Sequence, residues 1–141
     1  MHSIRLRGPW QFVIDPDNTD ASRAGKISLP GDWAKPIVDL DPGSASQPTR
    51  IMMTRTFNAP TGIESSKIYI VIENLGPPAE LRTSLTINDQ QVEPLVSEAS
   101  DESRRFDVTP HLAAHNQLAI QVTLNPTRNY FGEVTIQIHD Q

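Results

Sequence analysis

Short stretches of alternating apolar and polar residues, separated by turns rich in proline, glycine and asparagine, most constrain what this chain can fold into. The clearest stretch is residues 66–73, SKIYIVIE, in which isoleucines occupy every second position. Alternate side chains of a strand point to one face of a sheet, and apolar residues on both faces indicate a central strand. No segment keeps a helical period, and helix interiors reject proline, of which the chain has twelve. The sequence therefore predicts an all-β fold of roughly eight or nine short antiparallel strands, a sandwich or a barrel.

The length and composition fit one globular domain. The chain has 141 residues, of which 37% are hydrophobic and 21% charged, enough to bury a core. We therefore expect a single β-sandwich domain over residues 1–141. Residues 32–49, DWAKPIVDLDPGSASQPT, show no periodicity. Long ordered loops on compact domains are often functional, so this loop is a candidate binding region.

Charge and residue types exclude several functions. The net charge is −5 and no cluster of Lys or Arg is present, so we expect neither nucleic acid nor a membrane as partner. No stretch approaches the roughly 18 apolar residues of a membrane span. The chain has no cysteine, which excludes disulfides and thiolate metal sites. The first residues lack the apolar run of a signal peptide, and nothing in the sequence indicates a compartment.

The stretch FDVTPHLAAHNQLAIQVTL, residues 106–124, joins a helix start to a strand. Thr109 is a good N-cap, and Pro110 suits the first helical position, where a missing N–H costs nothing. Asn116 tolerates the left-handed conformation with which helices commonly end. We therefore expect one short helical turn near residues 109–115, which acts as a corner between two strands.

The same stretch resembles a motif near the end of the N-terminal sugar-binding domain of glycoside hydrolase family 2, the β-galactosidase and β-glucuronidase group. Further pieces occur in the family's order, namely GPWQF, LPGDW, TRTFNAP and KIYIVIENLGPPAELRTSLTIND. Together they cover nearly the whole chain. The resemblance implies a jelly-roll β-sandwich of the galactose-binding-domain-like type. It also implies a domain without catalytic residues, because the family's two catalytic glutamates lie in a separate (β/α)₈ barrel.

We accordingly expect a non-catalytic carbohydrate-binding-type module that binds a glycan or packs on a catalytic partner. The alternative is a purely structural or protein-interaction sandwich with no sugar site. The sequence contains no nucleophile elbow, zinc-protease motif, phosphate loop or dinucleotide fingerprint. No motif marks two carboxylates as the pair that glycoside hydrolysis needs. Neither enzyme activity nor a cofactor is therefore expected.

Three residues are candidates for contact with a sugar. An aromatic ring can stack on the C–H face of a sugar while a carboxylate accepts its hydroxyls. Asp32 and Trp33 stand side by side in the long loop, and Tyr130 opens the last strand, expected over residues 130–139. Two alternatives stay open, namely that Trp33 anchors the loop and that Tyr130 packs in the core. Trp10 and Phe12 alternate on the first strand and are expected in the core.

An arginine is predicted to point inward. Arg55 is in phase with its apolar neighbours Met53 and Phe57, and an inward charge must be paired. We expect a structural ion pair between Arg55 and Asp107, with Asp32 as the other candidate partner.

Metal sites have only weak candidates. His111 and His115 are spaced i, i+4 on the expected helical turn, a spacing that can bind zinc, but no third ligand is evident and both also suit the surface. The oxygen-rich segment DPDNTD, residues 15–20, is a weak candidate for a structural calcium site through Asp15, Asp17 and Asp20.

Overall fold

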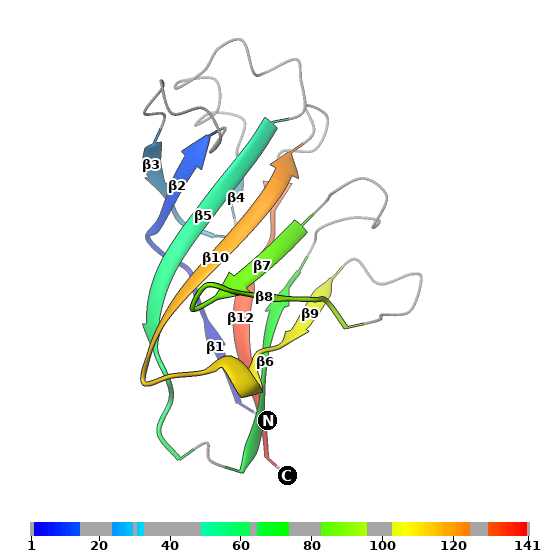
Figure 1. The fold of residues 1–141 in the computed structure, drawn as a ribbon. Coiled ribbons are helices and arrows are strands. Elements are labelled where there is room, and N and C mark those ends of the chain that lie inside the picture. Colours follow the sequence, from blue (N-terminus) through cyan, green and yellow to red (C-terminus); the bar gives the residue numbers. More distant parts are fainter. Residues whose placement is uncertain are drawn as a thin grey trace.

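The computed structural model describes residues 2–14, 24–29, 31–32, 49–62, 65–73, 83–95, 103–124 and 130–140, and almost all of them lie in or beside β-strands. The strands form two antiparallel sheets that face one another, and a small two-stranded ribbon (Figure 1). The predicted all-β sandwich is therefore confirmed. Among the described residues no helix is long and apolar enough to span a membrane.

The larger sheet has six strands, in the order β3 (Ala24–Ile27), β2 (Trp10–Ile14), β5 (Thr49–Asn58), β10 (His115–Leu124), β7 (Thr83–Ile87) and β8 (Gln90–Val92). The smaller sheet has four strands, in the order β1 (His2–Arg5), β12 (Val134–Asp140), β6 (Ser66–Ile72) and β9 (Arg104–Asp107). The ribbon joins β11 (Tyr130–Phe131) to β4 (Gly31–Asp32). Neighbours in each sheet are mostly distant in sequence, so long-range pairing dominates the fold.

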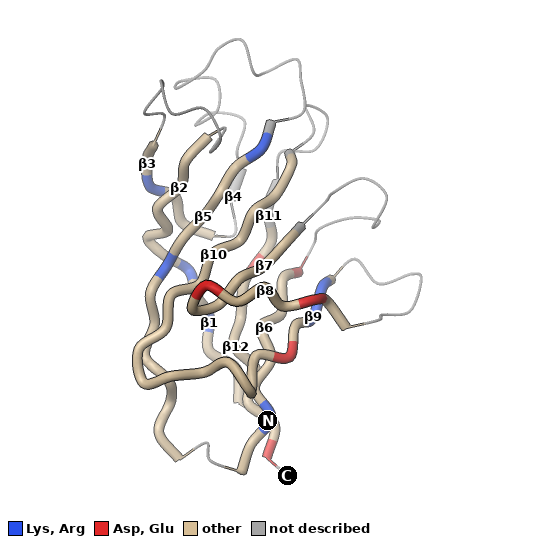
Figure 2. The backbone as a smooth tube through the Cα atoms, in the orientation of Figure 1, with Lys and Arg blue, Asp and Glu red and all other residues tan. Residues whose placement is uncertain are grey.

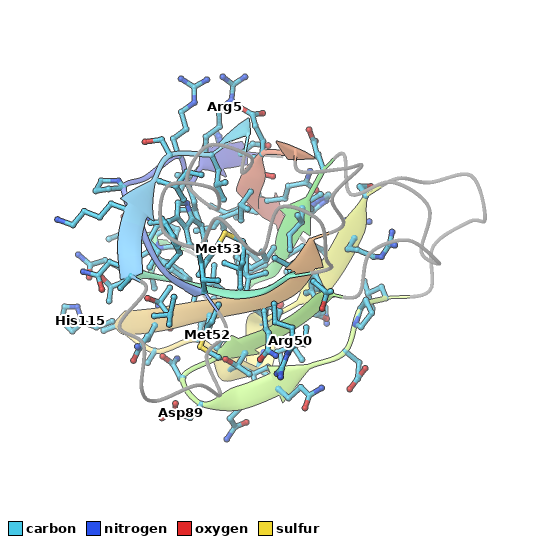
Figure 3. The ribbon with its side chains drawn as sticks, turned by 90° about the horizontal axis from the view of Figure 1, so that it is seen from above. Arg5, Arg50, Met52, Met53, Asp89 and His115 are labelled. Carbon is cyan, nitrogen blue, oxygen red and sulfur yellow. The ribbon has the colours of Figure 1, made fainter. Side chains whose placement is uncertain are left out.

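The core lies between the two large sheets and follows the period of two. On β5, Met53 is fully buried and points between the sheets, whereas Met52 lies on the outer side of the six-stranded sheet (Figure 3). Trp10 and Phe12 are 0% and 2% exposed, so their predicted core positions are confirmed. The Trp10 indole Nε1 donates a hydrogen bond of 2.7 Å to the Leu6 carbonyl, which satisfies its only polar atom.

Strand β6 occupies an interior position in the smaller sheet, between β12 and β9. Its isoleucines face the core, with Ile68, Ile70 and Ile72 at most 1% exposed. Val71, on the other face, is also buried at 7%. The central strand predicted from residues 66–73 is thus confirmed.

The predicted helical turn exists but is shorter than expected. It is a single 3₁₀ turn, Thr109–His111, with Val108 at the N-cap, and β10 already begins at His115. Thr109 is therefore the first residue of the turn rather than its cap. Its hydroxyl donates to an Asp107 carboxylate oxygen at 2.6 Å and accepts the backbone N–H of Ile68 at 2.9 Å. The turn is thereby tied to β6 and β9.

Asn116 stabilises this corner in a way different from the predicted left-handed helix end. It lies inside β10 and is 3% exposed. Its Oδ1 accepts the Ala113 N–H and the Asn88 amide, both at 2.9 Å, and its Nδ2 donates to the Ala113 carbonyl at 2.9 Å. Asn88 sits with Asp89 in the β7–β8 hairpin at φ of 52° and 68°, the positive values that a two-residue turn of this kind requires. The corner and the hairpin are therefore held together by the side-chain amides of the buried Asn116 and the half-buried Asn88.

Candidate functional site

The β4–β11 ribbon brings together two residues that the sequence analysis singled out for sugar contact. Asp32 and Tyr130 are direct Cα partners in its antiparallel register, and Gly31 pairs with Phe131. Trp33 follows Asp32 in sequence but lies outside the described residues, as do Asp15, Asp17 and Asp20. The ribbon thus forms a backbone platform for Asp32 and Tyr130, whose contact with a ligand stays a prediction.

The strand expected over residues 130–139 is divided into two, because its first two residues pair with β4. Tyr130 and Phe131 belong to β11, and the long C-terminal strand β12 begins only at Val134. Gly132 and Glu133 separate the two strands. The sequence alone shows a continuous run because both pieces are rich in strand-forming residues, whereas the break reflects two different pairing partners.

The predicted ion pair between Arg55 and Asp107 does not form among the described residues. Arg55 lies on β5 of the larger sheet and Asp107 on β9 of the smaller sheet. Lys67 is the cation beside Asp107, at 3.9 Å from its Oδ2. The Nε and Nη1 atoms of Arg55 are buried without a hydrogen-bond partner. The predicted inward phase of Arg55 is therefore correct and Asp107 is not its partner, while the side chain of Asp32, the other candidate, lies outside what the structure describes.

The environment of Asp107 favours its charged form. Partial burial raises the pKa of this carboxyl, but hydrogen bonds from the Thr109 hydroxyl and N–H lower it, and so does the nearby Lys67. The net pKa lies below the ordinary value. Asp107 therefore acts as a hydrogen-bond acceptor that orders the start of the 3₁₀ turn.

A cation–aromatic cluster covers part of the outer face of the smaller sheet and was not predicted. The Arg105 guanidinium carbon lies 4.0 Å from the centroid of the Tyr69 ring. The Tyr69 ring meets the His139 ring edge-on, with 5.2 Å between centroids. The Arg105 Nη2 is 3.2 Å from His139 Nε2. These three residues come from β9, β6 and β12, so no local sequence signal links them.

The two histidines considered for zinc do not share a helix face. His111 belongs to the 3₁₀ turn, where its Nδ1 is 3.1 Å from Gln90 Oε1. His115 begins β10, and its Nδ1 is 2.7 Å from Asn58 Oδ1. The helical i, i+4 spacing therefore does not exist in the fold. Within the part of the chain that is described, no group of three or more His, Asp or Glu residues could hold a metal ion.

Two adjoining hollows flank the beginning of β2. The first has a volume of about 310 Å³, and its lining includes Gln11, Thr54, Arg55, Thr56 and Gln117. The second, of about 330 Å³, shares Gln11 and Thr54 and adds Val13, Lys26 and Met52. Among the described residues, none that lines either hollow is a carboxylate. Figure 2 shows that β5, β10 and β7 carry no Asp or Glu, and that their only charged residues are the arginines of β5.

Known proteins provide a match in structure but none in sequence. No family model and no curated protein matches this chain. Its structure is similar to the β-glucuronidase of Ruminococcus gnavus in complex with an N1-substituted uronic isofagomine, with a TM-score of 0.70 and 15% identity over 98% of this chain and 29% of that one. A β-D-glucuronidase of Dictyoglomus thermophilum matches at a TM-score of 0.71 and 13% identity, over 99% of this chain and 28% of that chain.

A glycosyl hydrolase family 2 member of Bacteroides cellulosilyticus matches in the same way, at a TM-score of 0.68 and 13% identity over 99% of this chain and 21% of that chain. This chain therefore spans less than a third of the length of these glycosidases. At such low identity the likeness establishes the fold and nothing finer. The chain has the β-sandwich fold of one part of family 2 glycosidases, which confirms at the level of fold the resemblance carried by its motifs.

Proposed function

We propose that this chain is a non-catalytic accessory module of a family 2-type glycosidase, which packs beside a catalytic domain and contacts glycan. The observation that carries the proposal is the match itself, in which 98% of this chain aligns with only 29% of the R. gnavus β-glucuronidase. A unit that corresponds to less than a third of an enzyme fits the role of an accessory domain beside a separate catalytic domain. The described lining of the two hollows agrees, since glycoside hydrolysis needs two carboxylates and none is among the described lining residues.

Glycan contact is assigned to the β4–β11 ribbon. Asp32 and Tyr130 are opposed there, and Trp33 is the next residue in the chain. A carboxylate next to aromatic residues has the chemistry that sugar recognition uses, with hydroxyls accepted by the carboxylate and a C–H face covered by a ring. The ribbon therefore supports the glycan-binding form of the proposal.

Tryptophan fluorescence tests the glycan contact. The chain has two tryptophans, and Trp10 is fully buried, so a change on titration with galactosides or glucuronides reports Trp33. We expect a saturable change that is lost in Trp33→Phe and weakened in Asp32→Ala and Tyr130→Ala. A folded protein that responds to no glycan on an array would refute glycan contact and favour the purely structural or protein-interaction module.

The accessory role has its own test. The chain is mixed with a separately produced catalytic domain of a family 2 glycosidase, and complex formation is followed by analytical ultracentrifugation. We expect a complex in which the catalytic domain unfolds at a higher temperature, because a partner that binds only the folded state stabilises it. Independent sedimentation with unchanged unfolding would refute the role.

A further inference from the structure

The six-stranded sheet has a broad outer face, on the side away from the core, that is nearly uncharged. Among the described residues that point outward from β2, β5, β10 and β7, only Arg50 carries a full charge at neutral pH. The face meets solvent, since Gln11, Val13, Thr56 and Gln117 are exposed. Charged residues are depleted in the core of protein interfaces relative to the rest of the surface. The outer face therefore has the composition of an interface core.

One cross-strand row shows where the charges at its edges lie. Strand pairing places six outward residues side by side, in the order Lys26, Gln11, Thr54, Ala119, Thr86 and Gln91. Lys26 is at the β3 edge. At the β8 edge, Gln91 Nε2 donates to Glu93 Oε1 at 3.4 Å, and Asp89 lies in the adjoining turn. The face thus carries positive charge at one edge and negative charge at the other (Figure 2).

An apolar hollow lies on the β3–β2–β5 half of this face. It has a volume of about 330 Å³, and its lining includes Val13, Ala24 and Met52. Val13 is 38% exposed, and Met52 lies on the outer side of the sheet (Figure 3). Removing apolar surface from water is the main favourable term in protein association. The hollow is therefore the part of the outer face whose covering would stabilise a complex most.

We propose that the outer face binds the outer face of a second copy of this chain in a two-fold symmetric dimer. The axis runs along the strands, between β5 and β10, which are the two middle strands of the sheet. It brings β3 of each copy opposite β8 of the other, so Lys26 of one copy faces Glu93 of the other. Thr54 of one copy faces Ala119 of the other at the centre. Two sheets that pack face to face keep their strands within about 30° of each other, as this axis allows.

The charges at the two edges select this occupant. Lys26 and Glu93 have opposite signs and lie on opposite edges of the sheet, so the face is complementary to itself when turned about the two-fold axis. A contact of this kind uses the same patch on both copies and is closed, so it ends at a dimer. Arg50 is near the beginning of β5, at the end of the face, where it stays in solvent. The dimer uses no residue of the β4–β11 ribbon and does not depend on the proposed function.

The size of the face suits such a contact. Five spacings of about 4.8 Å make it about 24 Å wide, and the ten paired residues of β5 and β10 make it about 30 Å long at its centre. Because the edge strands are shorter, full contact would bury roughly 600 Å² per copy, or roughly 1,200 Å² in total, the lower end of the standard range for stable interfaces. We therefore expect a dimer that dissociates on dilution.

Sedimentation equilibrium of the chain alone, from about 1 μM to about 1 mM, tests the dimer. We expect the average mass to rise from the 15.7 kDa of one copy toward twice that mass. Ala119→Arg is expected to stay monomeric throughout, because it places a long charged side chain at the centre of the contact. Ser3→Arg is the matched control, since Ser3 is exposed on β1 of the other sheet. Thermal unfolding checks that both variants are folded.

A charge exchange tests the axis itself. Lys26→Glu and Glu93→Lys both change exposed side chains, so both variants are expected to fold. Each alone places like charges opposite each other twice per dimer, and we expect a Kd raised about tenfold. In an equal mixture of the two variants, both edge contacts of the mixed dimer again join a lysine to a glutamate. We expect the mixture to dimerise nearly as well as the wild type.

The possible outcomes decide between occupants. A chain that stays monomeric at about 1 mM, or a dimer that survives Ala119→Arg, would overturn the proposal. Equal dimerisation of the wild type, the two charge variants and their mixture would refute the Lys26–Glu93 contact and with it the axis. If the chain is monomeric and Ala119→Arg abolishes the complex with the catalytic domain, the face binds that domain, which refutes the dimer and supports the accessory role. A dimer that forms while the catalytic domain sediments independently supports the dimer and refutes the accessory role.

Discussion

Replacing Asn116 by alanine should destabilise the protein more than any other single polar substitution in the corner between the 3₁₀ turn and β10. The side chain is 3% exposed and makes three hydrogen bonds of 2.9 Å, to the Ala113 N–H, the Ala113 carbonyl and the Asn88 amide. Alanine removes the side chain that satisfies the two backbone groups of Ala113, which is exposed, and the amide of Asn88, which is half-buried. Each lost bond costs about 1 kcal/mol, so the expected loss in the free energy of unfolding is about 3 kcal/mol. For a chain of this size that corresponds to a fall in Tm of about 10 °C.

Urea unfolding followed by Trp10 fluorescence measures this loss, because Trp10 is fully buried in the core. Asn58→Ala is the matched control. Asn58 lies one residue from the strand partner of Asn116, and it bonds His115 at an exposed position, so we expect a change within about 0.5 kcal/mol.

A double-mutant cycle isolates the link between the corner and the hairpin. Asn88→Gly keeps the positive φ of 52° at low cost and removes the amide that bonds Asn116. We expect a coupling free energy of about 1 kcal/mol with Asn116→Ala. A loss below about 1 kcal/mol for Asn116→Ala alone, or strict additivity in the cycle, would refute the view that these side-chain amides hold this corner.

Further predictions concern the core and the outer face of the smaller sheet. Leu118→Asp places a charge at a position that is 0% exposed and should cost about 4 kcal/mol or more in urea unfolding, and a loss below about 1 kcal/mol would contradict its core position. The lowered pKa of Asp107 means that its interactions stabilise the fold above the ordinary carboxyl pKa of about 3.9 and are lost as pH falls through the folded-state value. Asp107→Asn should therefore lower Tm at neutral pH and converge with the wild type in strong acid, whereas a pH-independent difference would exclude this linkage. Tyr69→Leu removes the ring that Arg105 covers at 4.0 Å and should cost about 0.5–1 kcal/mol beyond the change in buried area, measured against Tyr69→Leu in an Arg105→Ala background.

Much of the fold could be predicted from local sequence patterns. The alternation in residues 66–73 predicted β6 and its interior position, because a strand buried on both faces carries apolar residues at successive positions. Asn88 and Asp89 are a local turn signal of the same kind, because asparagine and aspartate tolerate the positive φ that the β7–β8 turn needs. The pair of Thr109 and Pro110 predicted a helical turn, although the turn proved shorter and was capped differently.

The candidate site could be predicted from the sequence only in part. Asp32 and Tyr130 were chosen for their chemistry, and their pairing in the β4–β11 ribbon joins segments that no periodicity connects. The pairing of Arg55 with Asp107 was predicted wrongly, since the phase of a strand shows which face a charge occupies but not which side chain meets it across the interior. The role of Asn116 was also misjudged, because its hydrogen bonds reach a hairpin and a loop that only the folded chain brings near.

The sequence by itself determined which segments form strands, which faces those strands bury and where the chain turns, because strand periodicity and turn chemistry depend on neighbours within a few residues. Only the tertiary structure decided the strand order in each sheet, the break between β11 and β12, the amide contacts of the corner and the pairing of Asp107 with Lys67. These features depend on residues that are far apart in the chain. They form only when the two sheets pack on a shared core, because that packing decides which polar groups lie within hydrogen-bond distance.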